Sequence, residues 1–296
     1  MPTVPVNADS VSWKPASPKN FLSANVTGQA VKANADGTLT VAAGVVGGSA
    51  RGLVLENNSA FPDNAIDIAV AEVLLREPSG FVYLAQNVAV TASLIAPVGT
   101  PGALDAGFEA ASTWYYVWLI FDGTTVAGLF SASPTAPVMP SGYTFKARVG
   151  AVYNNAGSNL IRVMQLDKVV SIEEVVVFTL FGSNTNWNVL TDASLAAFRT
   201  AVPPIARSCM GNGGAVTNAI GGLALAPCNK DGTVNATNPM GVFYAFALTY
   251  QATPFDLWTL ANNYSVFVRG GANYNIQYKT FVAVARQRLT VTGFTL

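Results

Sequence analysis

Short apolar or alternating segments follow one another along most of this chain, and turn residues separate them at intervals of about 8–12 residues. Segments that alternate polar and apolar residues suit strands with one buried face, whereas continuous apolar runs suit strands buried on both faces. Segments of this length and spacing are typical of sandwiches and barrels rather than of βαβ units. The pattern therefore predicts an all-β fold.

Two hairpins are predicted most directly. An aromatic and aliphatic run at residues 114–121 ends at Asp122-Gly123, and an apolar segment follows at residues 126–133. Asp36-Gly37 likewise precedes the alternating residues 38–41. Further strands are expected at residues 52–56, 66–75, 81–85, 145–153, 160–166, 175–181, 205–210, 242–250, 264–269 and 274–289.

Only one segment has the signature of a helix. Residues 191–200 begin with a polar pair, place Leu195 and Phe198 three residues apart, and are followed by Pro203-Pro204. We therefore expect one short helix in an otherwise β-rich chain.

The β segments divide into two halves of similar length and texture. We expect two β-sandwich modules, jelly-roll-like, at residues 36–168 and 169–296. Residues 1–35 are polar and rich in proline, and we interpret them as an extended N-terminal arm. Two alternatives stay open for this arm: a flexible tail, or a segment that lies across a neighbouring subunit with Trp13 and Phe21 as anchors.

Charge and histidine content exclude several classes of function. The 296 residues include 16 lysines and arginines, 16 aspartates and glutamates and no histidine, so 11% are charged and the net charge is zero. A typical soluble domain is about 25% charged. Without histidine there is no Ser-His-Asp or Cys-His catalysis and no imidazole metal ligand. Without a basic cluster in the sequence, nucleic acid is not an expected partner. We expect no enzyme activity and no cofactor.

Hydrophobic residues make up 51% of the chain, yet the sequence predicts neither a secretory leader nor a membrane span. The first residues lack a basic region followed by an apolar one, and the long uncharged stretches are interrupted by glycine, asparagine or proline. A chain this apolar needs another way to cover its surface, and oligomerisation is the simplest.

The acidic residues are weak candidates for a metal or hydrolytic site. Asp63 and Asp67 lie four residues apart, as do Asp105 and Glu109, and such pairs in loops could supply oxygen ligands for Ca²⁺. They lack the spacing of a dedicated calcium loop, so we assign no metal ligand. The Glu173-Glu174 pair directly precedes an expected strand, where its side chains point to opposite faces and cannot share a substrate.

Three other features have ordinary structural interpretations. The glycine-rich residues 211–214 and 221–222 are interpreted as turns or surface loops rather than as a phosphate loop, because no Lys-Ser/Thr pair follows. The aromatic residues within 114–118 are interpreted as core rather than as a sugar-binding platform. Cys209 and Cys228 are expected to be two buried thiols, with a disulfide as the alternative.

Several motifs follow one another in a distinctive order. They are GLVLENN at residues 52–58, DNAIDIA at 63–69, GALDAG at 102–107, TWYYV at 113–117, LFSAS at 129–133, AP at 136–137, PSGYT at 140–144 and RVG at 148–150, and later VPPIAR at 202–207 and YSVFVRGG at 264–271. This order resembles virion structural proteins of tailed bacteriophages, a family of tail-fibre-like or decoration-like β modules. The resemblance covers about residues 50–165 and, more loosely, residues 200–289. The chain departs from the family at Val117, where a histidine is usual, and at Ala147, which interrupts a basic doublet.

The resemblance implies a structural component of a tailed-bacteriophage particle, a tail fibre or tail-associated protein that acts by protein–protein assembly. Its implied partners are copies of itself, in a homotrimer, and other virion proteins. Its implied location is the virion, assembled in the bacterial host cytoplasm without membrane insertion. The alternatives are a capsid decoration or head-fibre protein and a tip that binds a host receptor or glycan. The family brings no catalytic residues, and a polysaccharide depolymerase would need two carboxylates about 5–9.5 Å apart in a groove.

Overall fold

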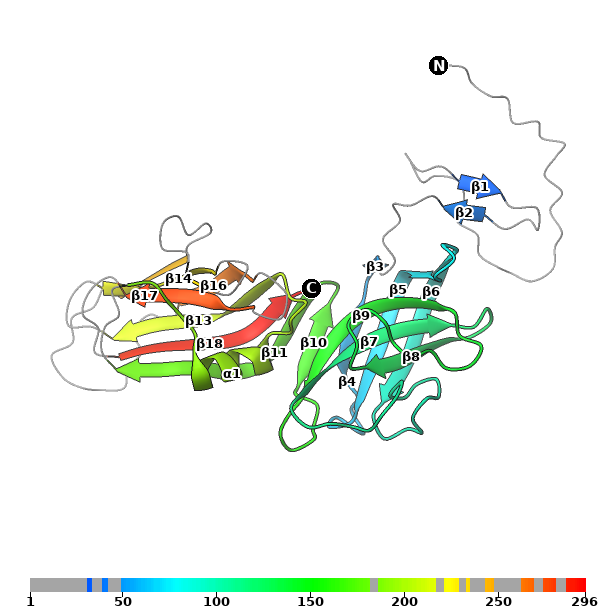
Figure 1. The fold of residues 1–296 in the computed structure, drawn as a ribbon, viewed down its shortest axis with the longest axis horizontal. Coiled ribbons are helices and arrows are strands. Elements are labelled where there is room, and N and C mark those ends of the chain that lie inside the picture. The colour runs from blue at the N-terminus through cyan, green and yellow to red at the C-terminus, as the bar shows by residue number, and fades with distance from the viewer. Residues whose placement is uncertain are drawn as a thin grey trace, which may run out of the picture.

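The computed structural model describes residues 31–33, 39–41, 49–181, 186–216, 221–228, 233–234, 243–247, 262–268, 274–280 and 286–296. Within them the chain folds into antiparallel sheets and one helix, which confirms the all-β prediction (Figure 1). The expected arm up to residue 30, including Trp13 and Phe21, lies outside the described residues. β1 (Val31–Ala33) and β2 (Leu39–Val41) pair antiparallel, as the hairpin prediction at Asp36-Gly37 requires.

The first half of the chain is sandwich-like. One layer contains β6, β5, β4 and β10, the other contains β9, β7 and β8, and a single pairing of Arg76 with Lys146 joins β5 to β9. The apolar side chains of both layers point between them, as the alternation along the strands predicts. The strands are β3 (Ala50–Arg51), β4 (Val54–Asn57), β5 (Ala65–Arg76), β6 (Val82–Ser93), β7 (Thr113–Phe121), β8 (Val126–Ser131), β9 (Phe145–Asn154) and β10 (Val163–Leu166).

The second half repeats the layered arrangement. The sheet of β16, β13, β18 and β11 faces a smaller sheet of β12, β17, β14 and β15, and helix α1 packs against β11 and β18. The elements are β11 (Val169–Phe181), β12 (Asn188–Val189), α1 (Asp192–Ala201), β13 (Ser208–Val216), β14 (Gly221–Pro227), β15 (Phe243–Ala247), β16 (Asn262–Phe267), β17 (Ile276–Thr280) and β18 (Arg286–Thr295).

The predicted helix is confirmed as α1. The Ser194 hydroxyl accepts a hydrogen bond from the Thr191 backbone N–H at 3.3 Å and donates to the Thr191 carbonyl at 2.6 Å, so the first turn is closed locally. Phe198 is fully buried, and the extended Val202 and the two prolines after it end the helix.

One sheet passes from the first half into the second through β11. The start of β11 pairs with β10 across the turn at Asp167 and Lys168, and β11 pairs with β18 along most of its length. The expected border between the two modules therefore lies at a hairpin turn, inside a hydrogen-bonded sheet.

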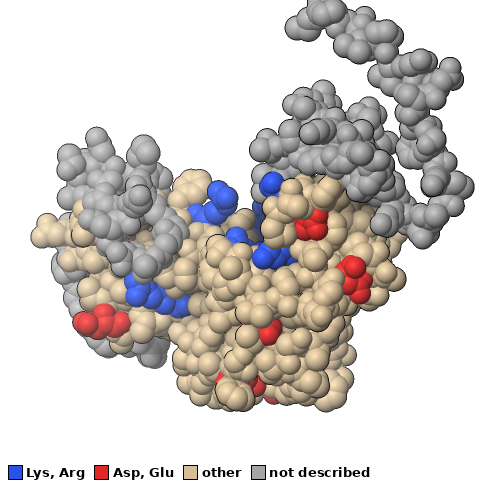
Figure 2. All heavy atoms as spheres, turned by 45° about the vertical axis from the view of Figure 1, so that its right-hand side comes forward, with Lys and Arg blue, Asp and Glu red and all other residues tan. Residues whose placement is uncertain are grey.

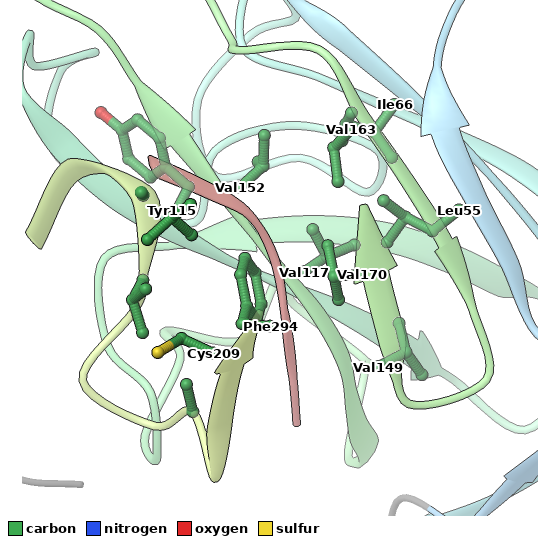
Figure 3. Close-up of a cluster of buried hydrophobic side chains, with 14 of the residues drawn as sticks. Leu55, Ile66, Tyr115, Val117, Val149, Val152, Val163, Val170, Cys209 and Phe294 are labelled. Carbon is green, nitrogen blue, oxygen red and sulfur yellow. The ribbon is translucent and has the colours of Figure 1, made fainter. Parts of the chain in front are cut away.

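The buried core is continuous in the same way. Leu55, Ile66 and Val117 from the first half belong to one hydrophobic cluster with Cys209 and Phe294 from the second (Figure 3). Because the sheet continues through β10 and β11, the side chains on its inner face form one layer across the junction.

The aromatic strand β7 is buried on both faces. Tyr115 and Val117 point into the common core, whereas Tyr116 and Trp118 belong to a second cluster covered in part by Met139, Tyr143 and Ile205. Tyr115, Tyr116 and Trp118 are each at most 5% exposed, so the interpretation of these residues as core is confirmed.

Trp114, the first aromatic of this strand, joins the two halves. Its indole Nε1–H donates a hydrogen bond of 2.8 Å to the carbonyl of Arg199 in α1. Its ring contacts Phe294 of β18 edge-on, with the ring centroids 5.8 Å apart. One half-buried side chain therefore provides both a polar and an apolar contact between segments far apart in sequence.

Several strand predictions were wrong about length. The strand expected at residues 175–181 begins at Val169 as β11, and the strand expected at residues 205–210 spans Ser208–Val216 as β13. Two others show the physical reason. The strand expected at residues 81–85 continues as β6 to Ser93, because it pairs with β5 along its whole length. The strand expected at residues 274–289 is two strands, β17 and β18, which belong to different sheets. In both cases the pairing partner sets the ends: β6 pairs with β5 directly before it, whereas β17 and β18 pair with strands far from them in sequence.

The interpretation of the glycine-rich residues 211–214 and 221–222 as turns or loops was also wrong. Residues 211–214 lie inside β13, and residues 221–222 begin β14. The structure leaves no room for a side chain at position 211, because a Cβ on Gly211 would overlap the Thr290 carbonyl oxygen of β18. Close approach of two backbones selects glycine at this position, rather than a turn conformation.

Candidate functional site

Asp63 and Asp67 are bound to protein groups. The Asp63 carboxylate forms an ion pair with Arg162 at 3.0 Å, and both partners are about half exposed. The Asp67 carboxylate accepts hydrogen bonds from the Asn58 amide at 3.0 Å and from the Thr91 hydroxyl at 2.6 Å. These contacts organise the loop before β5 and the strand beside it.

Asp105 and Glu109 have structural partners as well. The Asp105 carboxylate accepts the backbone N–H of Val138 at 2.8 Å, and Glu109 accepts a hydrogen bond of 3.0 Å from the buried Asn154 amide. In the part of the chain that the structure describes, no three histidine, cysteine, aspartate or glutamate side chains gather as metal ligands do.

The Glu173-Glu174 pair lies within β11 rather than before it. The pairing of β11 with β18 is irregular between Ser171 and Val175, so the strict alternation of faces fails there and both glutamates are exposed. Glu174 forms an ion pair of 2.8 Å with Arg288 on β18. The two carboxylates thus lie on an exposed strand surface, and one of them pairs across the sheet.

Both cysteines are buried and are not joined to each other, as expected. Cys209 lies on the inner face of β13, where burial raises the pKa of its thiol to about 12, although a hydrogen bond with Tyr264 works in the opposite direction. The thiol is therefore protonated at neutral and mildly alkaline pH, and its nucleophilicity is low.

We expect both thiols of the native protein to react with a disulfide reagent at mildly alkaline pH at least about a hundredfold more slowly than in denaturing guanidinium. This ratio corresponds to a local opening free energy of about 3 kcal/mol. The measurement is the rate at which the reagent's own thiol is released by reaction with the protein, with and without denaturant. A thiol that reacts at the denatured rate in the native protein, or the absence of two titratable thiols after unfolding without reductant, would contradict the burial described above.

A row of uncharged side chains crosses the outer face of the large sheet. Residues directly opposite each other in an antiparallel sheet point to the same face, so the strand registers define the row. We call it the transverse row. From β6 to β16 it consists of Ala89, Ala69, Val54, Leu166, Val169, Thr295, Ser208 and Phe267.

The transverse row exposes large apolar side chains at three of its strands. Leu166 is 53% exposed, Val169 is 46% exposed and Phe267 is 69% exposed. Met164, two residues before Leu166 on the same face of β10, is 49% exposed. Leu166 and Val169 lie side by side where the two halves join, whereas Thr295 and the buried Ser208 separate Val169 from Phe267. Contiguous exposed apolar surface of this kind marks interaction sites.

The sequence contained a local signal for this face. In β10, Val163, Met164 and Leu166 are all apolar, and only Gln165 is polar. A strand with one buried face usually carries polar residues on the other, so two apolar residues on the outer face of β10 are a departure that the sequence already shows. The row itself could not be read from the sequence, because it joins residues from eight strands through their registers.

The exposed aromatic side chains of the described residues are scattered. Phe61 and Phe108 lie in two separate loops of the first half, and Phe267 lies at the end of β16 in the second. Trp114, Trp118 and Trp187, the tryptophans that the structure describes, are half-buried or buried. In this part of the chain, no exposed aromatic cluster offers a stacking platform.

Comparison of the chain with models of known protein families finds no match, and neither curated proteins nor solved structures match it. Among the described helical residues, no helix is long and apolar enough to cross a membrane.

Proposed function

We propose that this protein is a structural component of a tailed-bacteriophage particle, a tail fibre or tail-associated protein that assembles with copies of itself through the transverse row. The exposed Leu166, Val169 and Phe267 are the observation that carries the proposal. They belong to a row of uncharged side chains on a regular sheet face, and a second copy that covers this row would bury their apolar surface.

Two further properties support the proposal. A net charge of zero leaves no overall repulsion between identical copies. The order of motifs from GLVLENN at residues 52–58 to RVG at residues 148–150 resembles virion proteins built from sandwich modules. In the proposed protein, two jelly-roll-like modules would form the body, three copies would associate, and other virion proteins would attach the assembly to the particle.

The proposal predicts that the purified chain is a trimer at micromolar concentration and that the double variant Leu166→Glu/Phe267→Glu is a monomer. Loss of a central interface anchor costs about 2 kcal/mol or more, and each buried glutamate adds an unpaired charge. The measurement is mass photometry or light scattering after size-exclusion chromatography.

Phe108→Glu is the matched control, because Phe108 is 92% exposed in a loop away from the transverse row. It should leave the trimer intact. A wild-type monomer, or a trimer that survives the double variant, would refute assembly through this face. Labelling of phage particles with an antibody against the chain then separates a position on the tail from the alternative of a capsid decoration or head fibre.

A further inference from the structure

A cleft of about 950 Å³ lies where the two halves meet. Its lining comes from the turn after β5, from β7 and β9, from the turn between β10 and β11, and from the segment before β13. Figure 2 shows this hollow open to solvent, with basic side chains on both of its sides. Its volume is in the range of sites that hold a small molecule or a short oligomer.

The cleft gathers positive charge on an otherwise charge-poor protein. Its lining includes five of the 16 lysines and arginines of the chain, but only two acidic side chains, Glu77 and Asp167, among the described residues. The Asp167 carboxylate is already engaged, since it accepts the Leu53 backbone N–H at 3.0 Å. The five cationic residues are Arg76, Lys146, Arg148, Lys168 and Arg207.

These five cations are not neutralised within the described chain. None of them forms an ion pair with a described carboxylate. Arg148 donates to the Pro134 carbonyl, and the Lys146 ammonium lies 5.9 Å from the centre of the Trp118 ring. Burial removes part of the solvation of the Arg148 charge and so lowers the pKa of its guanidinium. A ligand that brings negative charge would offset this cost.

Two neutral groups in the lining also lack partners. Trp118 is 5% exposed and Gln165 is 1% exposed, and neither the Trp118 Nε1–H nor the Gln165 Oε1 has a hydrogen-bond partner among the described residues. The Gln165 amide nitrogen donates to the carbonyls of Val149 and Asp167 at 2.7 Å each, so its oxygen is the remaining acceptor. One unpartnered donor and one unpartnered acceptor suit hydroxyl groups, which both donate and accept, directly or through a bridging water.

We propose that this cleft binds an anionic saccharide, in which sugar hydroxyls are combined with carboxylate, sulfate or phosphate groups. The anionic groups would contact the arginines and lysines, and the hydroxyls would reach the polar groups of Trp118 and Gln165. Single-stranded nucleic acid is the less suitable polyanion, because the ring of Trp118 is buried and cannot stack on a base. The cleft adjoins the transverse row, since its lining residues Lys168 and Arg207 are the chain neighbours of Val169 and Ser208. It would use charged groups for binding, whereas the row would use apolar ones.

Titration calorimetry of the full chain tests the proposal with oligogalacturonate, a dextran sulfate fragment, a neutral malto-oligosaccharide, inorganic phosphate and a single-stranded oligonucleotide. We expect a charged oligosaccharide to bind with an affinity that falls as salt rises, and the neutral one not to bind. Comparison of oligogalacturonate with the dextran sulfate fragment shows whether the cleft prefers carboxylate or sulfate groups.

The variant Lys146→Gln/Arg207→Gln neutralises cations from both halves, and we expect about a tenfold loss of affinity for each cation removed. Arg51→Gln/Arg162→Gln is the matched control, since these exposed arginines lie outside the described lining, and it should bind as the wild type does. Circular dichroism verifies that both variants are folded, and Arg76→Gln/Lys168→Gln provides a second cleft variant if the first is not.

Several outcomes would overturn the assignment. They are equal affinity for the charged and neutral oligosaccharides, equal affinity for inorganic phosphate, tighter binding of the oligonucleotide, and unchanged binding by a folded cleft variant. Release of new reducing ends from the oligosaccharide would also contradict the proposal that the cleft only binds its ligand. It would mean that Glu77 and Asp167 act as hydrolytic carboxylates.

Discussion

Replacing Gly211 with alanine is expected to destabilise the protein by more than about 3 kcal/mol, a large part of the 5–15 kcal/mol typical of a folded domain. A Cβ at this position would overlap the Thr290 carbonyl oxygen and would lie 2.8 Å from the Val291 Cα. Both atoms belong to the backbone of β18, so no side chain can rotate away to relieve the contact. The strands β13 and β18 would have to separate in the middle of the sheet.

Gly213→Ala is the control for this prediction. It lies two residues away on the same strand, but the nearest atom to a Cβ there is the Leu223 Cδ2 at 3.4 Å, an ordinary van der Waals contact. Its effect should stay within about 1 kcal/mol. The measurement is urea unfolding followed by circular dichroism. Equal stabilities of the two variants would show that β13 and β18 do not approach as described.

Replacing Trp114 with alanine is expected to cost about 3 kcal/mol or more and to uncouple the two halves of the molecule. The substitution removes the hydrogen bond to the Arg199 carbonyl and the edge-on contact with Phe294. Both contacts join the aromatic strand of the first half to the second half. Hydrogen exchange should therefore show β7 and α1 opening together in the wild type and separately in the variant.

Two further variants separate the causes of this effect. Trp114→Phe keeps the ring contact and loses only the hydrogen bond, so we expect a loss of about 1 kcal/mol with the halves still coupled. Trp187→Ala removes a tryptophan of similar burial whose ring lies 4.9 Å from the Lys279 ammonium, away from the junction. If Trp187→Ala uncouples the halves as Trp114→Ala does, the junction does not depend on Trp114.

The fold class was predictable because its signals act over a few residues. Asp122-Gly123 places a turn between two apolar runs, and the Thr191 region, Leu195 and the following prolines mark the helix without reference to any other segment. The burial of the aromatic strand could also be predicted, since an apolar run on both faces has to be covered on both.

The proposed assembly surface was only partly predictable. The low charge predicted a surface shared with partners, and β10 carries two exposed apolar residues, Met164 and Leu166, that fit this prediction. The alignment of Leu166 with Val169 and of Ser208 with Phe267 follows from strand registers, which are set by how distant strands pair.

The sequence by itself determined that this chain forms β-strands, where most of its turns lie, and that its inner faces are apolar, because alternation and turn chemistry are local properties. Only the tertiary structure decided that Gly211 lies against another backbone rather than in a turn. It also brought Arg76, Lys146 and Arg207 to one cleft, although the sequence contains no basic cluster. The physical reason is that these features depend on which strands pair and in which register, and the free energy of that pairing is shared among residues far apart in the chain.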